Sequence, residues 1–323
     1  MEYTTLGATG MEVSRLCLGC MSFGTPDWRE WVLEEDASRE IIERAIDLGI
    51  NFFDTANMYS RGESERVLGN ALSEYDRDEQ VVATKGFFRM REDDPNSGGL
   101  SRKALEQELA HSLDRLGMDT IDLYQIHRWD YDTPVETTLE TLDDAVRRGQ
   151  IRHAGASSMW ARQFARSQRV SEREGIARFE TMQNHYNLVY REEEREMLPL
   201  CQEEDVGVVP WSPLARGYLT RPHEEIDATT RGEAEEHMYE HPYRQNRAVN
   251  ERVEELADEY DASMAQIALA WVLDKEWVDA PIVGTTSVEH LEQAVEALDI
   301  DLSASDVEWL EAPYEPVPVS GHE

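Results

Sequence analysis

The 323-residue sequence has few cysteines and no long apolar run. Three cysteines are too few for a disulfide framework. Cys17 and Cys20 form a CxxC pair, but no second pair or histidine lies near them, so we expect small core residues rather than zinc ligands. No run approaches the roughly 20 apolar residues that span a bilayer, and the N-terminus lacks a basic segment followed by an apolar one. We therefore expect a soluble protein that is not secreted.

Positive charge is also scarce. Asp and Glu number 67 against 31 Lys and Arg, which gives a formal net charge of -36, and only Lys85, Lys103 and Lys275 are lysines. This charge repels phosphates and anionic lipids, so we expect no nucleic-acid or membrane partner. The acidic residues are spread along the chain, and their mutual repulsion needs screening by salt. The composition therefore predicts a cytoplasmic protein from the high-salt cytosol of a halophile, such as a halophilic archaeon.

The sequence lacks a Gly-x-Gly-x-x-Gly motif after its first apolar run, which argues against a Rossmann unit. Instead, eight short apolar runs alternate with amphipathic segments, after an opening suited to a hairpin around Gly7 and Gly10. The predicted strands span 16–19, 50–54, 80–84, 121–126, 152–156, 179–183, 206–211 and 280–284. The predicted helices span 37–48, 63–74, 101–116, 134–148, 159–170, 191–204, 262–274 and 287–298. This α/β pattern predicts a (β/α)₈ TIM barrel with an N-terminal hairpin, in one domain over residues 1–323.

Two predicted βα loops are longer than a connection requires. They span 24–36 after the first strand and 217–250 after the seventh. Long loops of this kind in compact domains are usually functional or mobile. From Asp301 onward the sequence predicts one extra helix and a proline-rich tail.

Ionisable residues end three consecutive predicted strands. Asp54, Lys85 and His127 stand at the ends of the second, third and fourth, and Tyr59 lies in the loop after the second. Because the carboxyl ends of barrel strands meet on one rim, we expect these side chains to converge. Each alone suits a structural role: a turn Asp, a solvated Lys, a satisfied core His or a packing Tyr. Together on one rim, and using one of only three lysines, they favour a functional site.

The four residue types also make chemical sense together. A Tyr hydroxyl has a pKa near 10, so it donates a proton near neutrality only if its anion is stabilised. The ammonium of Lys85 provides that stabilisation, and the Asp54 carboxylate keeps a buried ammonium charged. His127 can orient a carbonyl oxygen or share in proton transfer. The set delivers a proton to a carbonyl but no hydride, so it requires a reduced cofactor.

These residues resemble the aldo-keto reductase family over nearly the whole chain. Segments 53–59, 83–85 and 125–127 are similar to the family's motifs for the catalytic Asp, Tyr, Lys and His, and segment 18–24 looks most like the aryl-alcohol dehydrogenase-like and potassium-channel β-subunit-like branch. The resemblance implies an NAD(P)H-dependent oxidoreductase that reduces aldehydes or ketones to alcohols, or the reverse. In it, Tyr59 is the general acid, Lys85 and Asp54 tune it, and His127 aligns the carbonyl.

The resemblance also implies a nicotinamide cofactor. The positions of Ser157, Ser158 and Gln183 are similar to those that bind the carboxamide, and Trp211 resembles the aromatic residue that stacks on the ring. The remaining implied cofactor residues are Gly19, Cys20, Met21, Asp54, Ser212, Pro213, Leu214, Gly217, Gly284, Thr285, Ser287, His290 and Gln293.

Cofactor preference is the point at which the sequence departs from the family pattern. Members that strongly prefer NADPH often carry Lys and Arg where this chain has Gly284 and His290. The prediction of NADPH then rests on Thr285, Ser287 and His290, and NADH stays open as the alternative.

Five aromatic residues follow predicted strands on the same rim. They are Trp28, Trp31, Phe87, Phe88 and Trp129. They predict a pocket for an apolar or aromatic aldehyde or ketone, although rim aromatics also serve as loop packing. Two other functions stay open: a cofactor-binding regulatory subunit with slow redox turnover, and a barrel lyase that uses Lys85 as a Schiff base. Tyr59 and the cofactor-like segments argue against the lyase.

Overall fold

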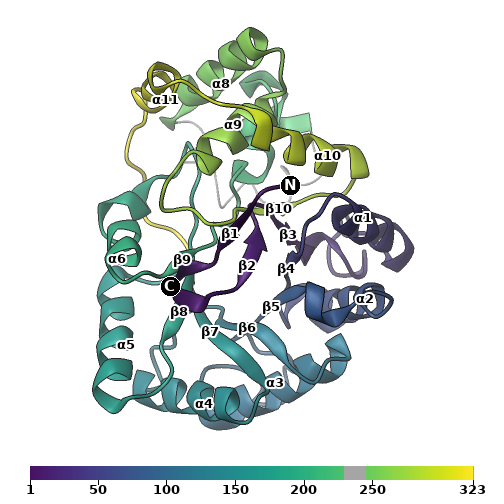
Figure 1. Ribbon diagram of the computed structural model, residues 1–323, viewed down its shortest axis with the longest axis vertical. Helices are drawn as coiled ribbons and strands as arrows, with labels where there is room; N and C mark the ends of the chain where they lie inside the picture. The colour runs from purple at the N-terminus through teal and green to yellow at the C-terminus, as the bar shows by residue number, and fades with distance from the viewer. Residues whose placement is uncertain (229–244, 323) are drawn as a thin grey trace.

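Eight parallel strands form a barrel at the centre of the molecule (Figure 1). The computed structural model describes residues 1–228 and 245–322. The strands are β3 (Cys17–Gly19), β4 (Phe52–Asp54), β5 (Val81–Gly86), β6 (Ile121–Ile126), β7 (Ile151–Ser157), β8 (Phe179–Gln183), β9 (Gly207–Val208) and β10 (Ile282–Gly284). Their order is β10-β3-β4-β5-β6-β7-β8-β9. The amides of Asp279 and Ile282 donate to the carbonyls of Val208 and Pro210 at 3.0 and 2.9 Å. These bonds join the last strand to the first, so the predicted (β/α)₈ barrel is confirmed.

Helices surround the barrel on its outer side (Figure 1). Those that follow the strands are α1 (Glu35–Asp47), α2 (Glu63–Leu72), α3 (Arg102–Leu116), α4 (Val135–Arg147), α5 (Ala161–Glu174), α6 (Met197–Glu203), α9 (Met264–Leu273) and α10 (Val288–Glu296). All eight were predicted. The prediction of one helix over 191–204 is wrong in detail, because a 3₁₀ helix (Glu192–Arg195) precedes α6. Pro199 explains the break, since its ring clashes with the carbonyl four residues earlier and it has no N–H to donate.

Among the described residues, one α-helix was not predicted. α8 (Arg247–Tyr260) begins inside the segment 217–250, which was predicted to be a loop. It buries Val249, Val253 and Leu256, which have helical spacing. Two 3₁₀ helices, Ala215–Thr220 and His223–Ala228, occupy the start of the same segment, and residues 229–244 lie outside the described part. The extra helix expected after position 301 is α11 (Ala304–Glu311).

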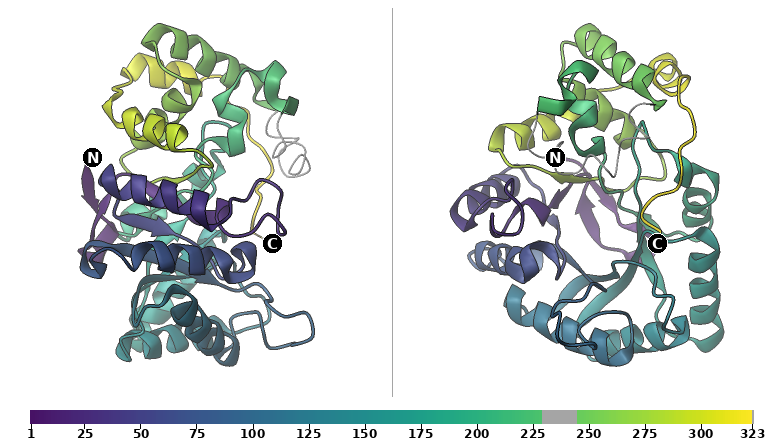
Figure 2. Two further views of the ribbon diagram at one scale, coloured as in Figure 1. Left: turned by 90° about the vertical axis from the view of Figure 1, so that its right-hand side faces the viewer. Right: turned by 180° about the vertical axis from the view of Figure 1, so that it is seen from behind.

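The N-terminal hairpin closes one end of the barrel. β1 (Tyr3–Thr5) pairs antiparallel with β2 (Glu12–Ser14), as predicted. Leu6 and Val13 are fully buried in one apolar cluster with side chains inside the barrel. Gly7, at φ +48°, leaves no room for a side chain, because a Cβ there would lie 2.2 Å from the Gly207 nitrogen. Figure 2 shows the hairpin and the C-terminal end on opposite sides of the barrel.

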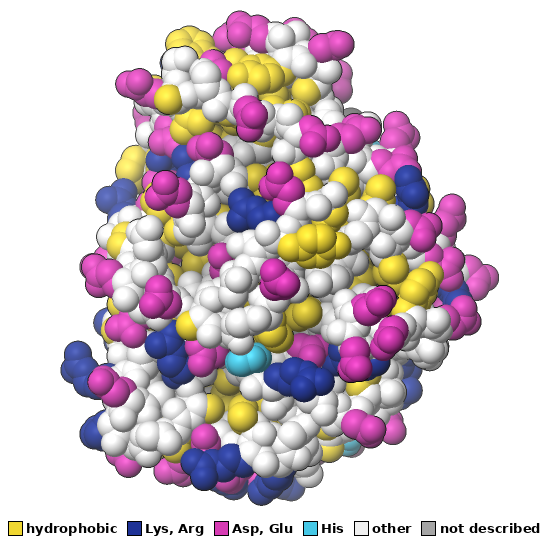
Figure 3. Space-filling view, in the orientation of Figure 1, with side chains coloured by type: hydrophobic (Ala, Val, Ile, Leu, Met, Phe, Trp, Pro, Cys, Tyr) yellow, Lys and Arg dark blue, Asp and Glu magenta, His cyan; other side chains and the backbone are white. Residues whose placement is uncertain are grey.

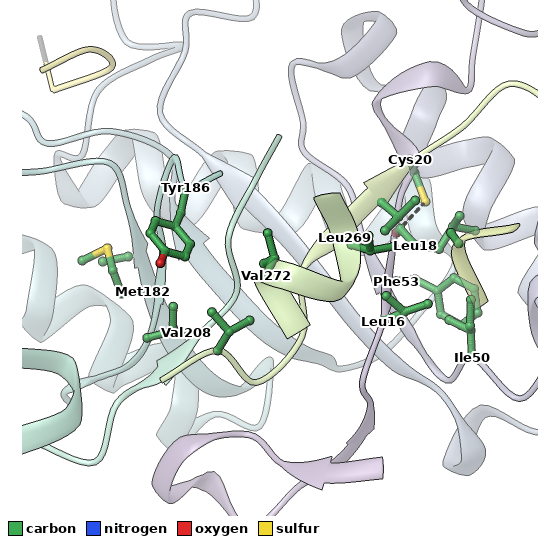
Figure 4. Packing of buried hydrophobic residues seen from close by; sticks show 14 of the residues in the cluster. Leu16, Leu18, Cys20, Ile50, Phe53, Met182, Tyr186, Val208, Leu269 and Val272 are labelled. Carbon is green, nitrogen blue, oxygen red and sulfur yellow. Dashed lines mark hydrogen bonds between the residues drawn. The ribbon is translucent and has the colours of Figure 1, made fainter. Parts of the chain in front are cut away.

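Strand alternation separates two apolar clusters and creates a polar layer. Phe52 and Ala83 face the barrel interior, while Phe53 and Val82 pack outward in the main cluster beneath the helices (Figure 4). Two residues after each inward apolar residue comes a polar one at the carboxyl end of the same strand: Asp54 after Phe52 and Lys85 after Ala83. The fold therefore places its apolar floor next to the hairpin and its ionisable groups at the opposite end.

The CxxC pair is divided between these clusters. Cys17 lies in the inner cluster and Cys20 in the outer one, and both are free thiols. Within residues 1–228 and 245–322, no group of three or more His, Cys, Asp or Glu side chains is arranged to hold a metal ion. In the same ranges, no helix combines the length and apolarity needed to cross a membrane.

Candidate active site

A buried ion pair lies at the centre of the polar layer. The Nζ of Lys85 is 2.5 Å from Oδ1 of Asp54 and donates to the carbonyl of Thr55 at 2.6 Å. The side-chain amides of Gln125 and Gln183 donate to the other carboxylate oxygen at 3.0 and 2.9 Å. Both side chains of the ion pair are at most 3% exposed. A buried charge pair needs such additional hydrogen bonds, because otherwise its desolvation is not offset.

The environment keeps Lys85 protonated. Burial lowers the pKa of Lys85, but the charge of Asp54, followed by that of Tyr59, outweighs burial, and the net pKa is raised. An amine held as an ammonium is not the nucleophile that a Schiff base requires. The lyase alternative therefore finds no support in this geometry.

Tyr59 lies above the ammonium. The Nζ of Lys85 is 5.0 Å from the centre of the Tyr59 ring. Burial raises the pKa of Tyr59 and the charge of Lys85 lowers it, with burial the larger effect, so the net pKa is raised. Stabilisation of the phenolate by Lys85 was expected from the sequence, whereas the larger, opposing effect of burial on the pKa was not. The result is a phenol that holds its proton, next to a cation that favours the anion once the proton leaves.

The backbone after Tyr59 is in an unusual conformation. Ser60 and Arg61 have φ of +47° and +56°, in the left-handed region that non-glycine residues rarely adopt. The loop is fixed by two hydrogen bonds of Asn57, just before the tyrosine. Asn57 donates its backbone N–H to the carbonyl of Lys85 at 3.0 Å and its side-chain amide to Glu108 at 3.1 Å. The Tyr59 hydroxyl group is therefore carried by a loop that is bonded to both strand and helix.

His127 faces the same group as a neutral imidazole. Its ring is 5.8 Å from that of Tyr59, edge to face, and 4.9 Å from that of Phe88. Burial, followed by the charges of Lys85 and Arg128, holds the pKa of His127 well below its ordinary value. Its Nδ1 is buried without a hydrogen-bond partner among the described residues. An orphaned buried nitrogen of this kind is the type of atom for which a ligand supplies the missing partner.

The ends of β7 and β8 present amide and hydroxyl groups. The Oγ of Ser157 and the backbone N–H of Ser158 both donate to the carbonyl of Gln183, at 3.1 and 3.2 Å. The side-chain amide of Gln183 donates to Asp54 and Gln125, which leaves its oxygen to accept. Asn184 adds a buried Oδ1 without a partner in the described ranges. Acceptors of this kind fit the amide nitrogen of a nicotinamide carboxamide.

Trp211 stands beside these groups. It follows β9, its Nε1 donates to the Oγ of Ser158 at 3.1 Å, and its backbone N–H donates to the carbonyl of Asn184 at 2.7 Å. The chain then turns through Ser212, at φ +53°, and Gly217, at φ +99°. Pro213 and Leu214 lie between them, buried and half-buried respectively.

The first and last barrel strands approach one another through glycines. Gly19 of β3 pairs with Gly284 of β10, and a Cβ on Gly19 would lie 2.6 Å from Cγ2 of Ile282. In the 3₁₀ turn that follows β3, Met21 is half-buried, but the Cys20 side chain belongs to the core. Of Cys20, therefore, only the main chain can line a ligand.

The N-terminus of α10 follows β10. Ser287 caps it by accepting from the backbone N–H of His290 at 3.2 Å, and Thr285 accepts from the N–H of Ser287 at 3.1 Å. His290 is exposed and Gln293 is half-buried one turn further along. Helix N-termini suit phosphate groups, so this segment fits the adenosine end of a dinucleotide.

Two of the five rim aromatics contact the rings of Tyr59 and His127. Trp28 lies 6.3 Å from Tyr59, and Phe88 lies against His127. Phe87 and Trp129 pack against the main core, and Trp31 lies beside Arg29. Of the five residues predicted to line an aromatic pocket, Trp28 and Phe88 are therefore the two that contact Tyr59 and His127.

The contributions of Gln125 and Arg128 to the site were not predicted from the sequence. Gln125 holds Asp54, and its signal was the alternation of Leu123, Gln125 and His127 into the barrel. Arg128 donates to the carbonyl of His127 at 2.7 Å, and its charge lowers the pKa of both Tyr59 and His127. Arg128 follows the end of β6, and no spacing pattern in the sequence predicts that its charge acts on the site.

Comparison with known proteins agrees with this geometry. The model of the Aldo/keto reductase family matches residues 15–315. The aldo-keto reductase dtxS3 of Metarhizium robertsii is 41% identical over 100% of this chain and 93% of its own length. A Schizosaccharomyces pombe protein that carries the provisional name aryl-alcohol dehydrogenase is 42% identical over 99% of this chain and 97% of its own. The versiconal hemiacetal acetate reductase of Aspergillus parasiticus is 40% identical over 98% of both. The chain therefore belongs to the aldo/keto reductase family, as an NAD(P)H-dependent oxidoreductase of carbonyl or alcohol substrates.

Proposed function

We propose that this single domain, residues 1–323, reduces aldehydes or ketones with NADPH, with Tyr59 as the proton donor. The observation that carries the proposal is the arrangement of Tyr59 above the buried Lys85–Asp54 pair, beside the neutral His127. The reverse reaction, oxidation of an alcohol, uses the same groups in the opposite direction.

Each of the four residues has a separate role in the proposed reaction. Bound NADPH supplies the hydride that the carbonyl carbon receives. Neutral His127 donates a hydrogen bond that orients the carbonyl oxygen, and Tyr59 gives its proton to that oxygen as it gains negative charge. Lys85 then stabilises the phenolate, and Asp54 keeps Lys85 charged. Because the strand ends position all four groups, little rearrangement accompanies proton transfer.

The substitution Tyr59→Phe tests the proton donor. It removes one hydroxyl and keeps the ring, so we expect kcat for 4-nitrobenzaldehyde to fall by about 10²- to 10⁴-fold. The affinity for NADPH, measured by calorimetry, is expected to stay within twofold of wild type. Undiminished turnover in Tyr59→Phe would refute the assignment.

The wild-type protein tests the regulatory-subunit alternative in the same assay. Tight NADPH binding with negligible turnover across a panel of aldehydes and ketones would favour a regulatory subunit. Turnover at ordinary rates would exclude it as the main function.

We also propose a substrate preference and a cofactor preference, each from residues at one end of the site. Trp28 and Phe88 contact the catalytic rings, which favours an aromatic or apolar carbonyl compound. The hydroxyls of Thr285 and Ser287, with His290 on the first turn of α10, favour a 2′-phosphate and hence NADPH. Comparing kcat/KM for NADPH and NADH at equal salt tests this, and a preference for NADH would reverse the proposal.

We further propose that the protein works in a cytoplasm of high salt concentration. The support is the net charge of -36, carried by 67 acidic residues against 31 basic ones. Self-repulsion on this scale destabilises the compact state unless ions screen it.

A further inference from the structure

His185 is the middle ring of a three-ring stack that ends at Trp211. Its ring centre lies 4.1 Å from that of Trp211, with 7° between the planes, and 4.1 Å from that of Tyr190, with 19° between the planes. His185 is 2% exposed and Tyr190 is 1% exposed, so this side of the indole faces the protein interior. One face of the residue proposed to stack on the nicotinamide is therefore covered by the imidazole.

The hydrogen bonds of His185 fix its tautomer. The side-chain amide nitrogen of Asn187 lies 3.2 Å from Nε2, and because that nitrogen only donates, Nε2 accepts. The proton of the neutral ring is then on Nδ1, which donates to the Oγ of Ser320 at 3.4 Å. The same amide of Asn187 donates to the carbonyl of Ser212 at 2.9 Å, next to Trp211 in the chain. Asn187 thus joins the imidazole to the main chain next to Trp211.

Burial keeps the imidazole neutral. It is the largest influence that holds the pKa of His185 well below its ordinary value, and the charges of Arg216, His322 and Arg128 act in the same direction. An uncharged imidazole stacks flat on the indole and needs no water molecule or counter-ion beside it.

The C-terminal tail docks on this stack. It runs from α11 to the end of the barrel opposite the hairpin (Figure 2). The backbone N–H of Ser320 donates to the hydroxyl of Tyr190 at 3.1 Å, and a Cβ on Gly321 would lie 3.6 Å from the indole of Trp211. The Nε2 of His322 lies 3.1 Å from the carboxylate of Glu193, and both side chains are 5% exposed. With the bond from His185 to Ser320, the tail therefore contacts all three rings and is held beside them.

We propose that His185 is a positioning residue for the nicotinamide ring, which acts through Trp211, and that Ser320 of the docked tail completes its hydrogen bonds. This inference rests on the proposed function. His185 touches neither substrate nor cofactor in this arrangement. It fixes the plane of the indole from one side, so that the opposite side of Trp211 is already in place when the nicotinamide binds, and less conformational freedom is lost on binding.

A double-mutant cycle tests whether His185 acts through Trp211. We expect His185→Ala to weaken NADPH binding about tenfold, because it removes the stacking partner of the indole. His185→Phe keeps a ring at this position and is expected to stay within threefold of wild type. In a Trp211→Ala background, His185→Ala is expected to add less than twofold, since its effect passes through the missing indole. Calorimetry measures each affinity without depending on turnover.

A ligand without nicotinamide provides the control. 2′-Phospho-ADP-ribose lacks the nicotinamide ring and keeps the rest of the cofactor, so all these variants are expected to bind it as wild type does. Ser320→Ala is expected to weaken NADPH binding about threefold and to carry the test if His185→Ala does not fold. Unchanged NADPH affinity in both His185→Ala and Ser320→Ala would overturn the inference. The inference would also be overturned if the variants weakened the binding of both ligands equally. The same holds if His185→Ala still weakened NADPH binding tenfold in the Trp211→Ala background. A wild-type protein that does not bind NADPH would instead refute the proposed function.

Discussion

Asp54 links its own strand, β4, to three other strands of the barrel through one carboxylate. One oxygen binds Lys85 of β5, and the other accepts from Gln125 of β6 and Gln183 of β8. Replacing this acid changes two things at once: the charge next to Lys85 and the acceptor that holds the two amides. The charge is the more consequential, because Asp54 contributes most to raising the pKa of Lys85 against its burial.

Asp54→Asn is expected to move the loss of activity to lower pH. Without the carboxylate, burial dominates and the pKa of Lys85 falls, so the ammonium that stabilises the Tyr59 anion is lost as pH rises through the lower value. We expect kcat for reduction to fall by about 10- to 100-fold at neutral pH and more steeply in alkaline buffer. The pH profile of kcat measures this.

Asp122→Asn is the matched control. Asp122 is also a buried strand carboxylate, but it pairs with Arg77 and Arg152 at the start of β6, away from Tyr59. Its substitution is expected to leave the shape of the profile unchanged. A profile for Asp54→Asn that superimposes on wild type would show that the carboxylate does not hold the charge of Lys85.

The sequence could predict the placement of the four ionisable residues but not what holds them. Asp54, Lys85 and His127 end consecutive strands, so their meeting follows from barrel topology alone. Gln183 lies 129 residues from Asp54, and Ser320 lies 135 residues from His185. Those contacts depend on side-chain direction and on the path of the tail, and no local periodicity encodes either.

A buried carboxylate holds two helices to β5. Glu65 of α2 accepts from the hydroxyl of Thr84, next to Lys85, and from Nε of Arg115 on α3, each at 2.6 Å. The Glu65 side chain is fully buried and that of Arg115 is 11% exposed. The Arg115 side chain also packs where a Cβ on Gly62 would lie, in the turn after Tyr59. This network therefore supports the loop that carries the tyrosine.

Arg115→Ala is expected to lower the free energy of unfolding by about 3–5 kcal/mol, because it leaves the charge of Glu65 buried without a partner. Denaturant unfolding measures the loss. Arg247→Ala is the control, since Arg247 forms only exposed ion pairs, with Glu224 and Glu251, and their removal is expected to change the free energy of unfolding little. The double variant Glu65→Gln with Arg115→Met removes both charges and is expected to cost less than Arg115→Ala. Equal losses for the two single variants would contradict the structural role of the network.

Element ends were predicted less well than element types. β9 has only two residues where the sequence predicted 206–211, because Pro210 cannot donate to a ladder and Trp211 turns toward Ser158. α8 was missed because acidic residues occupy most of the positions between its buried residues along the sequence, which hides the apolar pattern. In both cases the apolar pattern is present, and the competing signal from proline or from acidic composition obscured it.

Acidic side chains cover the molecule without gathering on one element. Figure 3 shows Asp and Glu spread over the face that carries the hairpin, with fewer Lys and Arg among them. α8 illustrates the consequence, because Glu255, Asp258 and Glu259 are all exposed and its last turn has no basic residue. Negative charge there opposes the helix dipole as well as the rest of the surface. The folded state is therefore expected to depend on dissolved ions more than the core alone would require.

Raising KCl from 0.1 to 2 M is expected to increase Tm by about 5–10 °C, since the screening length falls from about 10 Å to below about 3 Å. A sucrose solution of equal osmolality separates screening from general exclusion effects. The combined variant Glu255→Gln, Asp258→Asn and Glu259→Gln tests whether charge repulsion on α8 contributes to this effect. It is expected to raise Tm at 0.1 M KCl, where repulsion is long-ranged, and to have little effect at 2 M, where salt already screens it. A Tm independent of KCl, in wild type and variant alike, would show that charge repulsion does not limit the stability of this fold and would remove the support for a high-salt environment.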